Sequence, residues 1–242
     1  MINKLTLTPT AYTQPAPADT QIEPPATIRR TRGIASTRYL WKQNSTLNIS
    51  LFDMPEKAKD YVKKNILLWQ PYTNLKFNFI TSNDGDIRIS GTKKESTSHS
   101  VVGTLATRVP KDQPTMHIDL LQTADMLNHA IRHEFGHALG LEHEHDHPDH
   151  PVHWDRTKLD KEAERIGLSK AEEEFDFLTV LDPSTTTRSA YDPQSIMHYR
   201  VPAWFTTDGV DVPFNEEISE GDKKFMALLY PPAPESTTPS SN

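Results

Sequence analysis

The segment HEFGHALGLEH, residues 133–143, brings three histidines and two glutamates within eleven positions. His133 and His137 are four residues apart, and residues with that spacing on an α-helix lie on one face, about 6 Å apart along the axis. Their imidazoles can therefore bind one zinc ion, while Glu134 is placed to act as general base towards a zinc-activated water. This HExxH spacing predicts a metal site with a base beside it.

A catalytic zinc site needs a third protein ligand and one open position. His143 lies six residues beyond His137, and on a continuous helix it would face largely away from the metal. Gly140 can adopt the left-handed conformation that ends a helix, so the chain can turn and bring His143 back. A short HExxH is often an accident on a solvated helix face, but the extended pattern is expected by chance in about one in ten thousand such chains.

A second stretch, SIMHY at residues 195–199, follows some fifty residues downstream. Alone, it fits a turn with a buried methionine equally well. Together, the two stretches resemble the metzincin zinc peptidases, whose signature is HExxHxxGxxH followed by a Met-turn. Glu144 directly after the third histidine, and the sequence YDPQSIMHY, resemble the astacin branch of that group. A looser similarity extends over about residues 39–231.

The resemblance implies roles for further residues. Gly140 and Met197 would be structural at the site, with Met197 forming a hydrophobic floor beneath the ligands without binding the metal. Tyr199 would be a reversible fifth ligand that swings away and hydrogen-bonds the oxyanion of the tetrahedral intermediate. Substrate backbone would add to an edge strand. The residues implied to bind it are Val102, Gly103, Thr104 and Leu105.

The implied activity is that of a zinc-dependent endopeptidase, which hydrolyses extended polypeptides with a zinc-activated water and Glu134 as general base. We expect one Zn²⁺ per chain, a protein or peptide substrate, and a monomer. The main alternative is a catalytically weak or inactive peptide-binding pseudoprotease, against which the presence of both Glu134 and Tyr199 argues. A histidine-rich metal buffer would instead bind several zinc ions.

The chain departs from the family in two respects. It has no cysteine, which excludes disulfides and a cysteine-based latency switch. No segment before residue 39 matches an inhibitory propeptide, so Glu144, which in the family receives the N-terminus released by activation, is free to bind another internal group. The histidine-rich sequence after the third ligand predicts either a polar rim or a secondary metal-binding loop; its residues are His145, His147, His150 and His153.

Hydrophobic periodicity predicts the elements that must position these residues. Alternation predicts a sheet of about five strands. Four helices are predicted: one before the metal motif, one carrying it from a Thr123 cap to Leu139, one in the C-terminal lobe, and one at the C-terminal end capped by Ser219. The fold class is therefore α+β, zincin/metzincin-like, with an irregular C-terminal lobe. The expected strands are 46–52, 75–80, 86–90, 100–106 and 115–120, and the expected helices are 56–69, 123–139, 171–178 and one beginning after Ser219.

Composition and charge indicate which partners, locations and domain boundaries to expect. The net charge of −7 and the absence of long Lys/Arg blocks argue against nucleic acid as a partner, and no stretch approaches the ~18 apolar residues of a membrane span. The start lacks a classical signal peptide, which leaves cytoplasmic location or signal-independent export open. We expect Thr/Pro-rich tails at 1–35 and 232–242, and a peptidase domain at 36–231 with an upper lobe at 36–142 and a lower lobe at 143–231.

Overall fold

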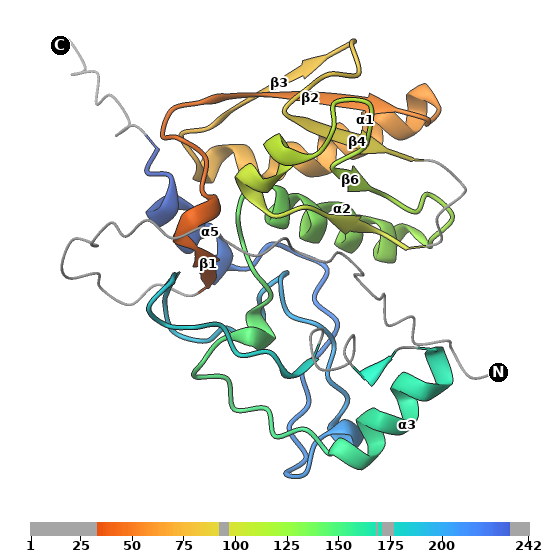
Figure 1. The fold of residues 1–242 in the computed structure, drawn as a ribbon, viewed down its shortest axis with the longest axis vertical. Coiled ribbons are helices and arrows are strands. Elements are labelled where there is room, and N and C mark those ends of the chain that lie inside the picture. Colours follow the sequence, from red (N-terminus) through yellow and green to blue (C-terminus); the bar gives the residue numbers. More distant parts are fainter. Residues whose placement is uncertain (1–32, 92–96, 168, 171–176, 233–242) are drawn as a thin grey trace, which may run out of the picture.

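The computed structural model describes residues 33–91, 97–167, 169–170 and 177–232. A five-stranded sheet in the order β3-β2-β4-β6-β5 forms the upper half of Figure 1. β5 lies at one edge and is antiparallel to β6, whereas the other pairs are parallel. The strands of this sheet are β2 (Thr46–Phe52), β3 (Lys76–Ile80), β4 (Ile87–Ser90), β5 (His99–Ser100) and β6 (Met116–His117).

The helices divide between the two halves of the molecule. α2 lies directly beneath the sheet, and α3 lies in the loop-rich half below it (Figure 1). A second, two-stranded antiparallel sheet joins β1 (Ile34–Ser36) to β7 (Thr186–Arg188). The α-helices are α1 (Glu56–Ile66), α2 (Ala124–Ala138), α3 (Arg156–Ile166) and α5 (Glu220–Leu229), and short 3₁₀ helices include η2 (Leu67–Tyr72), η3 (Gly103–Arg108) and η4 (Glu144–Asp146).

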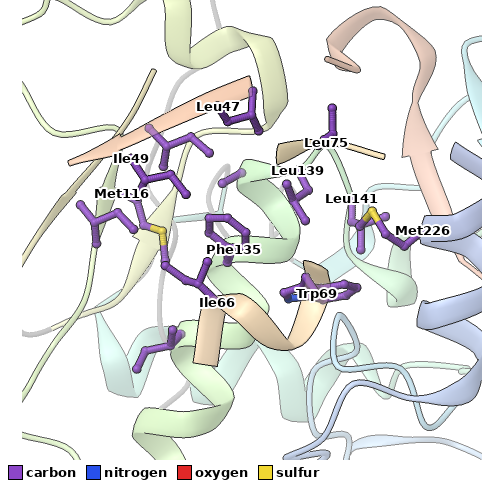
Figure 2. Packing of buried hydrophobic residues seen from close by; sticks show 14 of the residues in the cluster. Leu47, Ile49, Ile66, Trp69, Leu75, Met116, Phe135, Leu139, Leu141 and Met226 are labelled. Atoms are coloured by element: carbon purple, nitrogen blue, oxygen red, sulfur yellow. The ribbon is translucent and has the colours of Figure 1, made fainter. Parts of the chain in front are cut away.

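The main core fills the space between the sheet and α1 and α2 (Figure 2). Phe135 on α2 meets Phe77 on β3 edge-on, with ring centroids 5.1 Å apart. The indole nitrogen of Trp69 donates to the carbonyl of Arg132 at 3.1 Å, so this large buried side chain also fixes α2. Since burying a large apolar side chain contributes about 1.5–3 kcal/mol, this core fixes the position of the helix that carries the metal motif.

A smaller apolar cluster organises the lower half. It contains Phe177 and is lined on one side by Tyr199 of the predicted Met-turn. Helix α3 contributes Leu159 and ends at Gly167, whose φ of 85° is a left-handed cap. The other fully buried members of the cluster are Val152, Val201, Phe205 and Val212.

Most of the predicted elements are confirmed, including a sheet of five strands, and the α+β fold class is correct. The strand prediction for 100–106 is wrong beyond Ser100, because Gly103 has a φ of 47° and starts η3. A Cβ at Gly103 would lie 1.9 Å from the carbonyl oxygen of Tyr39. This close approach of two distant backbones sets the turn, and periodicity cannot reveal it.

The other differences are local. The helix predicted at 56–69 ends at Ile66, from which η2 continues through Pro71. The expected strand at 115–120 is reduced to β6. Helix α3 and strand β7 were not predicted, whereas α5 begins at its Ser219 cap with a complete capping box. Residues 171–176 of the helix predicted at 171–178 lie outside the described part of the chain.

The first strand, β1, begins within the range expected for the N-terminal tail. β1 starts at Ile34, and Ile34 and Ala35 are both buried, so ordered structure already includes the last residues of the range 1–35. Residues 1–32 and 233–242 lie outside the described residues, and the tails stay predictions. Within the described residues, no helix combines the length and apolar character needed to cross a membrane.

Candidate metal centre and active site

Three histidines converge at the C-terminal end of α2. The Nε2 atoms of His133 and His137 are 3.1 Å apart, and those of His137 and His143 are 3.0 Å apart. The three residues form a group whose potential ligand atoms all lie within 4.8 Å of one another. The structure therefore brings together the three histidines that the sequence predicted as metal ligands.

Gly140 makes this convergence possible. Its backbone N–H donates to the carbonyl of His137 at 2.8 Å, and the N–H of Leu141 donates to the carbonyl of Gly136 at 3.0 Å. This pair of bonds is the Schellman arrangement, which ends a helix at a left-handed residue. Gly140 has a φ of 105°, a conformation that L side chains rarely adopt. The predicted turn after α2 is confirmed.

Hydrogen bonds orient the first two rings. Nδ1 of His133 lies 2.8 Å from the carbonyl oxygen of Ile196, and Nδ1 of His137 lies 2.8 Å from that of Leu141. A carbonyl accepts only, so each Nδ1 carries the proton and each Nε2 lone pair faces the common point. Burial lowers the pKa of His137 to about 4 and holds the pKa of His133 well below its usual value, which keeps both rings neutral, as metal binding requires.

This donor set fits zinc. Tetrahedral zinc with Zn–N bonds of about 2.0–2.1 Å would separate its nitrogen ligands by about 3.3 Å, close to the 3.0 and 3.1 Å between the Nε2 atoms. Three neutral imidazoles leave a fourth position open, which is the arrangement of catalytic rather than structural zinc sites. His133, His137 and His143 would hold the ion.

Glu134 follows the first of these histidines on α2. It is buried, and its Oε2 has no hydrogen-bond partner among the residues that the structure describes. Burial raises the pKa of Glu134 to about 8. A buried carboxyl group with an unsatisfied oxygen is costly for stability, and such groups concentrate at sites where they exchange protons with a substrate or water.

The Met-turn packs directly under α2. An ideal Cβ on Gly136 would lie only 2.4 Å from Sδ of Met197, so the absence of a side chain at Gly136 lets the methionine reach the helix. Asp222 holds the turn from α5: its carboxylate accepts from the Ser195 hydroxyl at 2.6 Å and from the backbone N–H of Ile196 at 2.8 Å. Met197 thus packs against the helix that carries His133 and His137, and its role as a floor beneath the ligands stays a prediction.

Tyr199 lies against the same cluster from the lower half. Its ring centroid is 4.4 Å from that of His143 and 6.0 Å from that of His133. The neighbouring His198 bonds elsewhere, with Nε2 2.8 Å from the Tyr191 hydroxyl and Nδ1 2.6 Å from the Tyr199 carbonyl oxygen. His198 is therefore a structural hydrogen-bonding residue.

The expected substrate-binding segment follows the sheet edge. Val102 has extended backbone next to β5, whereas Gly103, Thr104 and Leu105 belong to η3. The N–H of Leu105 donates to the Val102 carbonyl at 3.1 Å. An added strand would therefore pair with β5 and the residues directly after it rather than with η3.

The four histidines of residues 145–153 have three kinds of surroundings. His147 and His150 accept backbone N–H groups of their own loop, from Asp149 and Val152 respectively. His153 is exposed. Only His145 belongs to a potential metal group among the described residues, together with His143 and Asp146. Most of this histidine-rich segment therefore shapes its loop.

Three features of the site escaped the sequence analysis. Gly136, Asp222 and Asp146 each matter through a contact with a distant or looped segment. In the sequence, Asp222 stands out only as the last residue of a capping box that begins at Ser219. That pattern gives no indication of a role at the Met-turn. Glu144 accepts the Asp192 N–H at 2.7 Å and so does bind an internal group.

Comparison with known proteins agrees with this geometry. Residues 34–212 match the family model Astacin, which describes a peptidase family. A structure of myroilysin is 32% identical, with a TM-score of 0.79 and coverage of 83% of this chain and 100% of that one. A crystal structure of myroilysin is 30% identical (TM-score 0.58, coverage 81% and 87%). No curated protein matches the sequence.

A more distant structure shares the fold alone. High choriolytic enzyme 1, a hatching-enzyme zinc protease from the medaka fish Oryzias latipes, is 18% identical with a TM-score of 0.57, over 82% of this chain and 97% of that one. The family match spans most of the described residues, from β1 to beyond the Met-turn. The chain therefore belongs to the astacin family, and it is a zinc metalloendopeptidase whose three-histidine cluster is consistent with the family's HExxHxxGxxH zinc site.

Proposed function

We propose that this protein hydrolyses extended polypeptides with Glu134 as general base and Tyr199 as a donor to the developing oxyanion. The proposal rests on the convergence of three imidazole rings. The Nε2 atom of His137 lies 3.1 Å from that of His133 and 3.0 Å from that of His143, and the next residue after His133, Glu134, carries a buried carboxyl group. Zinc, when bound there, would polarise the scissile carbonyl and make hydroxide available near neutral pH. His133, His137 and His143 are the proposed ligands.

Glu134 takes the proton of the attacking water and delivers it to the leaving amine. Its raised pKa suits both steps, because a group that titrates near neutral pH can accept and return a proton. Its unsatisfied oxygen is available for a hydrogen bond with the water. The ring of Tyr199 lies beside that of His143 at an interplanar angle of 52°, from where its hydroxyl would reach the oxyanion after a side-chain rotation.

Substrate would lie extended along the sheet edge formed by β5 and Val102. Among the described residues, β6 is the strand that pairs with β5, and β5 stands at the edge of the sheet, where an added strand could pair. Substrates are proteins or peptides, and we propose that the protein acts on them as a monomer, without nucleic-acid or membrane partners.

The test combines zinc content with cleavage of a quenched-fluorescent peptide library. We expect one zinc per chain and cleavage by the wild type, with a loss of at least 10²–10⁴-fold in kcat for Glu134→Gln. Glu56→Gln is the matched control, since Glu56 is exposed and pairs with Lys59 on the surface of α1. Full zinc occupancy without cleavage by the wild type, including a form starting at Gly33, would instead support the peptide-binding pseudoprotease.

A further inference from the structure

The third histidine is held differently from the other two. His133 and His137 stand on α2, and a backbone carbonyl fixes each Nδ1. His143 lies beyond the end of that helix, as the residue before η4. Its Nδ1 faces a side chain instead: Oδ2 of Asp146 is 3.9 Å away. The ligand with the weakest backbone support therefore has a carboxylate as its neighbour.

We propose that Asp146 is a positioning residue for the metal centre, which orients His143 and raises its affinity for zinc. A metal-binding histidine usually donates its second ring N–H to a carboxylate, carbonyl or water, which fixes the ring and makes its other nitrogen a better donor. The separation of 3.9 Å is longer than a hydrogen bond, and an adjustment of about 1 Å would let the neutral ring donate its Nδ1–H to the carboxylate.

The backbone of Asp146 is fixed on both sides. Its N–H donates to the His143 carbonyl at 3.2 Å, and its carbonyl accepts the N–H of Leu181 at 3.1 Å. The side chain is only 11% exposed. A carboxylate placed this close to the metal ligand in a largely dry environment interacts strongly with the positive charge of a bound ion, because solvent screening is weak there.

His145 completes the arrangement. Its ring stacks on that of His143 with centroids 4.9 Å apart, and on that of Tyr199 at 4.4 Å. Its Nε2 lies 3.4 Å from the other oxygen of Asp146. The side chain of His145 is fully buried, so it excludes water from the space between the carboxylate and the third ligand.

The same three residues could in principle hold an ion of their own, since His143, His145 and Asp146 form a second potential metal group. In that arrangement His143 would bridge two ions, one on each ring nitrogen, and its ring would have to lose the remaining N–H proton. The positioning role uses the neutral ring, and a measurement of zinc stoichiometry distinguishes the two.

The inference rests on His143 as a zinc ligand, and its test uses zinc affinity, so an inactive protein would still answer it. The dissociation constant of zinc is measured on the full chain by competition with a chelator at about pH 7.5. We expect Asp146→Asn, which keeps the shape and removes the charge, to raise that constant about 10–100-fold. Asp149→Asn is the matched control, because that carboxylate lies in the same loop with its side chain 68% exposed; its constant should change less than about twofold.

Two further measurements separate positioning from simple loss of structure. Asp146→Glu, which restores the charge, should recover part of the affinity, and the unfolding free energy of the metal-free Asp146→Asn protein should stay close to that of the wild type. An unchanged dissociation constant for Asp146→Asn would overturn the proposal. So would a second bound zinc equivalent in the wild type that disappears in Asp146→Asn.

Discussion

The contact between Gly136 and Met197 gives a prediction whose sign can be worked from the structure. In Gly136→Ala the new methyl group would meet Sδ of Met197 at 2.4 Å, about 1 Å closer than an ordinary contact. Met197 is buried under the helix, so either it or α2 must shift. Overpacking of this kind costs about 1–3 kcal/mol, which outweighs the ~1 kcal/mol that alanine gains over glycine in a helix.

Removal of the methionine should reverse that sign. Met197→Ala alone leaves a cavity and is expected to cost about 2–5 kcal/mol. In its presence Gly136→Ala no longer meets the sulfur and instead fills part of the space. The second substitution should then stabilise the protein by about 1 kcal/mol, so the two changes are coupled by about 1–3 kcal/mol.

The assay is urea unfolding of the metal-free proteins in a double-mutant cycle, since bound zinc would add its own contribution to stability. Gly167→Ala combined with Met197→Ala is the control, because a Cβ at Gly167 meets nothing within 4 Å, and that pair should be additive within about 0.5 kcal/mol. Additivity of the Gly136 and Met197 changes to the same limit would refute the reasoning.

Two other predictions concern the lower half of the site. Tyr199→Phe should lower kcat by about 10²–10³-fold with KM and zinc content nearly unchanged, because only the oxyanion donor is lost. A rise in KM by a similar factor with kcat unchanged would contradict that role. Burial lowers the pKa of His198 to about 4, below the ~6.5 of the unfolded chain. Its stability contribution is therefore complete above about pH 6.5 and is lost as pH falls towards 4. Between about pH 7 and pH 5.5 the unfolding free energy of the wild type should fall by about 1.3 kcal/mol more than that of His198→Gln, whereas His153→Gln, at an exposed histidine, should behave like the wild type.

The elements that local patterning specifies were predictable. β2 alternates polar and apolar residues from Thr46 to Leu51, and it was predicted with its observed bounds, Thr46–Phe52. α5 carries a Ser219 cap with Asp222 three positions on, and it begins where those residues require. These features depend on neighbours within a few positions, so the sequence contains the information that fixes them.

The metal ligands could also be predicted from the sequence, because their signal is the spacing of three histidines along the chain. His133 and His137 share a helix face by periodicity alone, and Gly140 allows the turn that returns His143. One segment of eleven residues, 133–143, thus contains the three predicted zinc ligands and the predicted general base. Helix α3 carries a comparable signal in its Asp155 cap and Gly167 end, but its weakly apolar sequence gives little periodicity to find it by.

Contacts between distant segments were decided only by the tertiary structure. The chain turns into η3 where the backbone of Gly103 packs against that of Tyr39, and Met197 reaches α2 because Gly136 has no side chain. Asp146 faces the third ligand because a 3₁₀ turn and the N–H of Leu181 fix its backbone. The sequence by itself determined which residues can bind zinc and where the chain must turn. Packing between residues far apart in the chain determined what orients them, because the energy of such contacts depends on three-dimensional proximity that no local pattern encodes.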